Sequence, residues 1–205
     1  MIRLFTFLLF LVFSGSAAAG SGPQKLDDFL QNFKTLSARF EQSVLDTRSA
    51  EVGRFQGQLF VSRPGRFRWD YSEPYEKEIL ADGDQVYVID SELEQITYVS
   101  QERALKDTPA SVLIDADQLD ERFEIIDIGS SQNMDWVELL PRDAESQFTR
   151  VLLAFAGDDL RRMEMADKFG QITRFQFYDV QRNPQLDSQL FVFERRQGYD
   201  LIDQF

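Results

Sequence analysis

The chain has 205 residues and a formal net charge of −13, and it contains neither cysteine nor histidine. Without these residues it cannot form a disulfide, a Ser-His-Asp or Cys-His catalytic arrangement, or a metal site built on cysteine or histidine. The acidic charge disfavours nucleic acid, although solubility alone also explains it. The sequence therefore nominates no catalytic residue, no metal ligand and no cofactor.

The first nineteen residues have the pattern of a cleavable signal peptide. Arg3 supplies the positive start, residues 4–13 are almost wholly apolar, and three alanines at 17–19 offer a cleavage site. The apolar stretch is shorter than the ~20 residues that a membrane-spanning helix needs. We therefore expect a cleaved signal peptide at 1–19 and a single domain at 20–205.

The exported part begins with one amphipathic helix and continues with many strands. Leu26, Phe29, Leu30 and Phe33 follow helical spacing, whereas from Leu36 the apolar residues recur at every second position. Turn signals such as 82–84 and 157–159 separate the strands. The expected strands after the first are 52–62, 66–71, 77–81, 85–89, 94–99, 123–128, 136–140, 150–155, 160–166, 171–180 and 189–195.

The middle of the chain interrupts this pattern. Residues 101–122 indicate short helices, one of which would carry Val112, Leu113 and Ile114. Short connections favour antiparallel pairing on both sides of this insertion. The predicted fold class is α+β and predominantly antiparallel β, with one curved sheet or open barrel of about ten strands.

Several strands have apolar residues at both odd and even positions, for example at 59–61, 151–153 and 191–193. A sheet with one face in water should alternate between apolar and polar residues more regularly, so we expect both faces to be covered. The first helix is the candidate for one cover, and the middle helices are the candidate for the other. The second apolar space is then either an ordinary core or a pocket for an apolar ligand.

Few motifs in the chain carry chemistry. Residues 115–120 are spaced like a calcium loop, but Asp120 stands where glycine is required, so we reject this site. Paired carboxylates could serve a hydrolase, although any such pair among 35 acidic residues is uninformative. Arg63 precedes a Pro64-Gly65 turn, where it either lies on the surface or holds a covering helix through its backbone carbonyls.

An ordered set of segments resembles the LolA family of periplasmic lipoprotein carriers. The resemblance extends over nearly all of the exported part and is strongest between Leu59 and Gln95. The matching segments are Ala38-Arg39-Phe40-Glu41-Gln42, Leu59-Phe60-Val61-Ser62-Arg63-Pro64-Gly65-Arg66-Phe67-Arg68-Trp69, Pro74, Ile79-Leu80-Ala81-Asp82-Gly83, Val86-Tyr87-Val88-Ile89-Asp90, Leu93-Glu94-Gln95 and Thr108-Pro109-Ala110.

The resemblance implies an incomplete barrel with an α-helical lid over an apolar cavity, and a carrier without enzymatic activity. Such a carrier receives the acyl chains of outer-membrane-directed lipoproteins from an inner-membrane ABC transporter and passes them to the outer-membrane receptor lipoprotein LolB. A monomer suits this role. A carrier of another lipid or glycolipid on the same scaffold is the alternative.

The resemblance also assigns residues to the site. Arg63 corresponds to the arginine that holds the lid closed, and Phe67 would lie near the cavity mouth. Parity and resemblance together place Phe40, Leu59, Phe67, Trp69 and Ile79 at the cavity or its mouth, and the lid helices would carry Val112, Leu113 and Ile114.

Overall fold

The computed structural model describes residues 22–105, 110–114 and 119–204. The expected signal peptide at 1–19 and the expected helix start at Thr108 and Pro109 lie outside these residues. Within them, the helices are α1 (Gly22–Gln31), α2 (Gln101–Leu105), α3 (Ala110–Ile114), α4 (Leu119–Arg122) and the 3-10 helix η1 (Ser188–Phe191).

The strands of the described residues form a single sheet. They are β1 (Thr35–Leu45), β2 (Glu51–Ser62), β3 (Arg66–Glu73), β4 (Lys77–Asp82), β5 (Gln85–Asp90), β6 (Gln95–Ser100), β7 (Phe123–Ser131), β8 (Met134–Pro141), β9 (Phe148–Ala156), β10 (Asp159–Asp167), β11 (Ile172–Arg182) and β12 (Asp200–Asp203).

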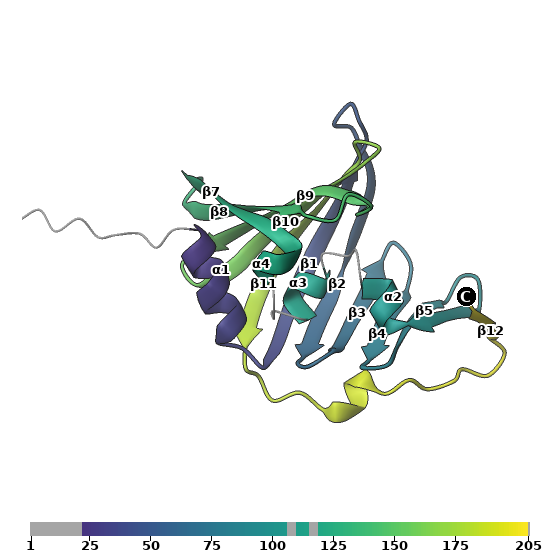
Figure 1. Cartoon of the computed structure of the whole chain (residues 1–205). Helices are drawn as coiled ribbons and strands as arrows, with labels where there is room; N and C mark the ends of the chain where they lie inside the picture. The colour runs from purple at the N-terminus through teal and green to yellow at the C-terminus, as the bar shows by residue number, and fades with distance from the viewer. Residues whose placement is uncertain (1–21, 106–109, 115–118, 205) are drawn as a thin grey trace, which may run out of the picture.

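This sheet is long, bent and open. Its order is β12-β6-β5-β4-β3-β2-β1-β11-β10-β9-β8-β7, so β12 and β7 form two separate edges. Every neighbouring pair is antiparallel except β12 with β6. Figure 1 shows how the sheet curves around the short helices. The predicted fold class, an antiparallel sheet in an open barrel with a few short helices, is confirmed, with twelve strands in place of about ten.

All four α-helices lie on the concave face, which we call the inner face (Figure 1). Leu26, Phe29 and Leu30 of α1 belong to the same buried cluster as Leu113 of α3 and Leu119 of α4. α1 packs mainly against β7, β8 and β9, and α3 packs against β2. The expectation that α1 and the middle helices cover opposite faces is therefore wrong, because both fill the hollow of one bent sheet.

The opposite, outer face is covered in part by the C-terminal segment, residues 183–199. Figure 1 shows this segment leaving β11 and returning to the sheet at β12. Phe191 is buried, and the ring of Phe193 stacks on Tyr87 of β5 at 3.9 Å between centroids. Beneath it, Leu80 is only 2% exposed although it lies on the outer parity of β4.

The expected strand at 189–195 is wrong. Residues 188–191 form η1, and Asp187 caps it by accepting a hydrogen bond from the Gln189 N–H. Phe191, at the end of η1, and Phe193, two residues further on, both pack on the outer face without forming a strand. The final strand is β12, which the sequence analysis does not include. No helix in the described ranges combines the length and the apolar character that crossing a membrane requires.

Candidate functional site

The five residues expected at the cavity lie together on the inner face. Leu59 of β2, Trp69 of β3 and Ile79 of β4 are register partners and form a row across three strands. Phe40 of β1 and Phe67 of β3 flank this row within the same buried cluster. Phe40, Leu59, Phe67 and Trp69 are between 1% and 7% exposed, while Ile79 is partly buried. The alternating parity of these strands is sufficient to bring them together.

Aromatic rings dominate this part of the inner face. The ring centroids of Phe40 and Trp69 are 5.4 Å apart, and those of Trp69 and Phe175 are 5.0 Å apart. Both pairs meet edge to face, an arrangement that aromatic rings prefer. Phe177 continues the row beside Phe175 on β11. The result is a broad apolar floor that spans β1, β3 and β11.

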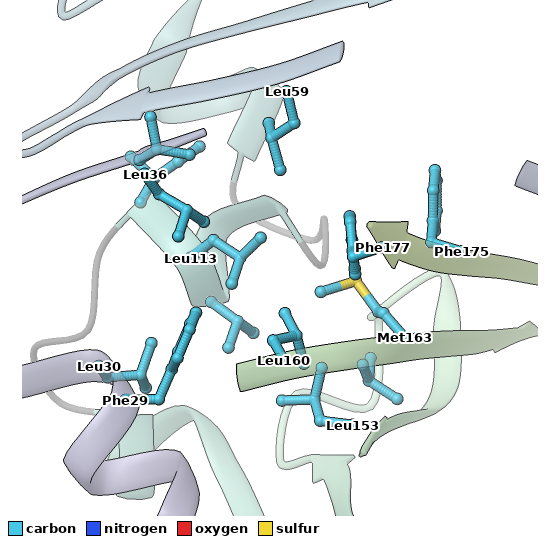
Figure 2. Packing of buried hydrophobic residues seen from close by; sticks show 14 of the residues in the cluster. Phe29, Leu30, Leu36, Leu59, Leu113, Leu153, Leu160, Met163, Phe175 and Phe177 are labelled. Carbon is cyan, nitrogen blue, oxygen red and sulfur yellow. The ribbon is translucent and has the colours of Figure 1, made fainter. Parts of the chain in front are cut away.

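The helix α3 closes over this floor. Val112, Leu113 and Ile114 are at most 4% exposed and belong to the same cluster as the floor residues. Figure 2 shows Leu113 lying in the middle of the labelled side chains, near Leu36 and Leu59. These three side chains themselves fill the space in which the family resemblance predicts a cavity.

Arg63 joins α3 to α1 at the end of β2. Its Nε and Nη2 atoms donate hydrogen bonds to the Leu113 carbonyl at 3.0 and 2.8 Å, and Nη1 donates to the Leu30 carbonyl. The guanidinium also stacks on the Phe33 ring, with 3.8 Å between Cζ and the ring centroid. One planar side chain thus holds the last turns of two helices, a geometry that the fork of arginine donors permits.

Other polar side chains bind the middle helices to the turns of the sheet and to one another. Gln101 of α2 donates to the Gly65 carbonyl at 2.7 Å and accepts from the Gly83 N–H at 3.2 Å. Arg142 donates to the Asp120 carbonyl of α4 at 3.0 Å, and Arg122 donates to the Ser111 hydroxyl of α3. Sequence spacing does not predict these bonds, because most of the groups that Gln101 and Arg142 bind are backbone atoms of residues distant in the chain.

A cleft of about 850 Å³ lies beside the lid, between the two halves of the bent sheet. Its walls come from the β2–β3 and β4–β5 turns, from α2 and α3, and from β7 and β9. Ile114 lines it, whereas none of the five floor residues does. The cleft is therefore separate from the floor, and α3 contributes side chains to both.

Polar groups are sparse on the inner face next to the floor. The Tyr71 hydroxyl donates to Gln42 Oε1 at 2.9 Å. Burial raises the pKa of Tyr71 far above its usual range, so its hydroxyl stays protonated. Among the described residues no group of acidic side chains is arranged to hold a metal ion. This surface is suited to apolar contact and offers few hydrogen bonds.

Comparisons with known proteins agree with this architecture. The family described as "Outer membrane lipoprotein carrier protein LolA" matches residues 31–194. An outer-membrane lipoprotein carrier protein of Nitrosospira multiformis is 38% identical over 97% of this chain and 96% of its own. That of Dechloromonas aromatica is 36% identical over 91% and 89%. An uncharacterized conserved protein of Thermus thermophilus shares the fold, with a TM-score of 0.56, 12% identity, and coverage of 89% of this chain and 99% of that one.

Proposed function

This chain belongs to the LolA family, and we propose that it carries the acyl chains of lipoproteins on its inner face, beneath a lid that lifts. The aromatic floor around Phe40, Leu59, Phe67, Trp69 and Ile79 would receive the hydrocarbon. Arg63 would hold α3 and α1 together in the empty state.

One observation carries this proposal: α3 covers the floor through side-chain packing and the hydrogen bonds of Arg63, without being part of the sheet. An element held in this way leaves the sheet at a lower cost than a strand would, because no ladder of backbone hydrogen bonds is broken.

The lid also limits how tightly cargo is held. Burial is worth about 0.8 kcal/mol per methylene, so three chains of about 16 carbons offer on the order of 35 kcal/mol. This exceeds the practical ceiling of roughly 20 kcal/mol for noncovalent binding. Val112, Leu113 and Ile114 already occupy the floor in the closed state. Cargo must displace them, and this competition would lower the net affinity enough to allow handover.

In this scheme the chain works in the periplasm. It receives lipoproteins from an inner-membrane ABC transporter and delivers them to the outer-membrane receptor lipoprotein LolB. The proposal includes no catalytic role, since the chain lacks both histidine and cysteine. The names of its relatives, outer-membrane lipoprotein carrier proteins, support this assignment.

Photocrosslinking in cells tests the proposal. A benzophenone amino acid replaces Phe67 or Trp69 on the inner face, and the matched control places it at Phe60. Phe60 is adjacent to Leu59 but lies on the outer parity, opposite Arg68. Illumination should yield adducts from positions 67 and 69 whose mass spectra contain acylated lipoprotein N-termini.

The proposal requires the yield of lipoprotein adducts to be higher on the inner face than on the outer face. Equal yields of lipoprotein adducts at position 60, or none at 67 and 69, would contradict it. Adducts with free lipid or glycolipid alone would favour a carrier of another cargo on the same scaffold.

A further inference from the structure

The interior contains one polar atom that the closed fold does not use. Within the described part of the chain, Trp69 Nε1 is the only buried side-chain nitrogen or oxygen atom without a hydrogen-bond partner in the protein. Trp69 is 7% exposed and its nearest aromatic neighbours are Phe40 and Phe175. Buried tryptophan N–H groups usually find an acceptor.

Leaving this donor without an acceptor is costly. A buried unsatisfied polar group costs about 1–3 kcal/mol, and phenylalanine would fill an apolar floor without that cost. The other polar group of the floor is satisfied, because the Tyr71 hydroxyl pairs with Gln42. Trp69 is therefore the one position on the floor that retains a free donor for something that enters.

The position of Trp69 along β3 defines what kind of acceptor would reach it. The inner-face residues of β3 run from Phe67, at 4% exposed, through Trp69 to Tyr71, which is only partly buried. Glu73, at the end of the strand, is exposed. Trp69 thus lies where the packed interior gives way to the more open end of the floor.

Acyl lipids also have a boundary, between their hydrocarbon chains and their polar part. Each hydrocarbon chain ends in one carbonyl group, the ester or amide that joins it to the polar part of the molecule. A chain laid on Phe67 and Leu59 would bring this carbonyl to the level of Trp69. The polar part would then extend toward Tyr71 and Gln42.

We propose that Trp69 Nε1 donates a hydrogen bond to the acyl carbonyl of bound lipid, and so fixes how far the chain enters the interior. This inference rests on the proposed carrier function and adds to it a specificity residue and an orientation. Hydrocarbon would lie on the Arg63 side of Trp69, and the polar part of the cargo on the Tyr71 side.

A pair of lipids that differ only in the carbonyl tests the inference. Dipalmitoyl phosphatidylglycerol has two ester carbonyls, and its dihexadecyl ether analogue has the same chain length and headgroup without them. Affinities for both are measured on the full mature protein and on Trp69→Phe. A third variant places benzothienylalanine at position 69, which keeps the indole shape but lacks the N–H.

We expect the wild-type protein to bind the ester lipid about threefold to tenfold more tightly than the ether lipid, the range of one net hydrogen bond. Both variants should lose this preference while the benzothienylalanine protein retains its affinity for the ether lipid. The preference is the ratio of the two lipid affinities measured in one protein. Looser packing in Trp69→Phe would weaken the binding of both lipids and would leave this ratio unchanged.

A spectroscopic measurement locates the bond. Trp136 is the only other tryptophan in the sequence, and its Nε1 already donates to the Ser131 carbonyl at 3.1 Å. In a Trp136→Phe background, the indole N–H proton resonance of Trp69 should move downfield with the ester lipid and much less with the ether lipid.

Each result has a definite meaning. If both lipids bind equally and give the same indole resonance, the inference is wrong while the carrier proposal stands. The inference is also wrong if the indole N–H of the lipid-free protein already shows the resonance of a hydrogen-bonded donor, as a bond to an internal water would produce. If neither lipid binds, the carrier proposal itself fails.

Discussion

Arg63 is a single residue on which two helices depend. Its guanidinium bonds the Leu113 carbonyl twice and the Leu30 carbonyl once, and it stacks on Phe33. Lysine has a point charge in place of a planar fork, so it cannot reproduce this geometry. The bonds go to backbone carbonyls near the ends of short helices, where acceptors have few partners within the helix.

Replacing Arg63 with leucine should loosen the lid. Hydrogen bonds to a charged group contribute about 1.5–3 kcal/mol, and we expect the closed state of the variant to lose on the order of 2 kcal/mol. Hydrogen–deuterium exchange of the peptide that contains residues 110–114 should accelerate. Arg48→Leu is the control, because Arg48 is exposed and pairs with Asp46 in the β1–β2 hairpin.

The same variant should also hand over cargo more slowly. A weakened closed state competes less well with hydrocarbon for the floor, so bound lipoprotein would leave later. Unchanged lid exchange together with normal release to the receptor would count against Arg63 as a latch.

At the scale of single residues, the alternation of apolar and charged residues along the strands predicts the floor. The hydrogen bonds that hold the middle helices could not be predicted. Phe67, Trp69 and Tyr71 alternate with charged residues, so their common face follows from the sequence. The partners of Gln101 are Gly65 and Gly83, in two turns that become neighbours only through the pairing of β3 with β4. No spacing along the chain indicates such a contact.

At the scale of elements, α1 is fixed to the sheet at its first turn. Lys25 forms an ion pair with Asp135 of β8, and the Ser130 hydroxyl donates to the same carboxylate. Close packing adds to this, because a Cβ at Gly22 would lie 2.3 Å from the Trp136 carbonyl oxygen. The opposite end of α1 is bound by Arg63, which donates to the Leu30 carbonyl.

The Asp135 carboxyl predicts a dependence of stability on pH. The hydrogen bonds from Lys25 and Ser130 hold the pKa of Asp135 below its ordinary value of 3.8. A lowered pKa in the folded state adds stability above the unfolded value, and that stability is lost as the pH falls through the folded value. Urea unfolding at pH 7 should therefore show Asp135→Asn to be about 1 kcal/mol less stable than wild type.

That difference should shrink as the pH falls below about 4, because the wild-type carboxyl is then increasingly protonated. Asp158→Asn, at an exposed position in the β9–β10 turn, is the control and should change little at either pH. A deficit of Asp135→Asn that is equally large at pH 7 and at the lowest pH would exclude the ion pair as its cause.

The C-terminal segment has no regular structure apart from η1, yet it packs closely on the outer face. Arg68 on the outer face binds Asp70, Glu78 and the Leu190 carbonyl, and Glu78 also pairs with Arg196. Aromatic stacking of Phe193 on Tyr87 adds to this charged network. The apolar run at 191–193 is compatible with a strand, but here it includes the end of η1 and residues without regular structure. Sequence alone does not reveal whether such a run has a hydrogen-bonded neighbour.

Phe193→Ala should release this segment locally. Trypsin should then cut after Arg195 or Arg196 several-fold faster than in the wild-type protein, while the unfolding midpoint changes little. Val192→Ala is the matched control, since Val192 is 46% exposed and lies beside Phe193. If Phe193→Ala and Val192→Ala are cut at the same rate, the stack does not hold the segment.

At the scale of the whole molecule, the two faces of the bent sheet are covered in different ways. Its outer face is covered near β3–β5 by a segment anchored with charges and a ring stack. Its inner face is covered by short helices held by a few polar ties. The sequence showed that both faces are apolar, but it could not assign the covers, because parity does not say from which side a helix approaches.

The most direct test is a structure of the mature protein purified with bound lipoprotein acyl chains. The account predicts that α3 leaves the floor, with Val112, Leu113 and Ile114 displaced, and that hydrocarbon contacts Phe40, Leu59 and Phe67. Hydrocarbon held only in the cleft beside the lid or on the outer face, with α3 still packed on Leu59 and Arg63 still bonded to Leu113, would contradict it.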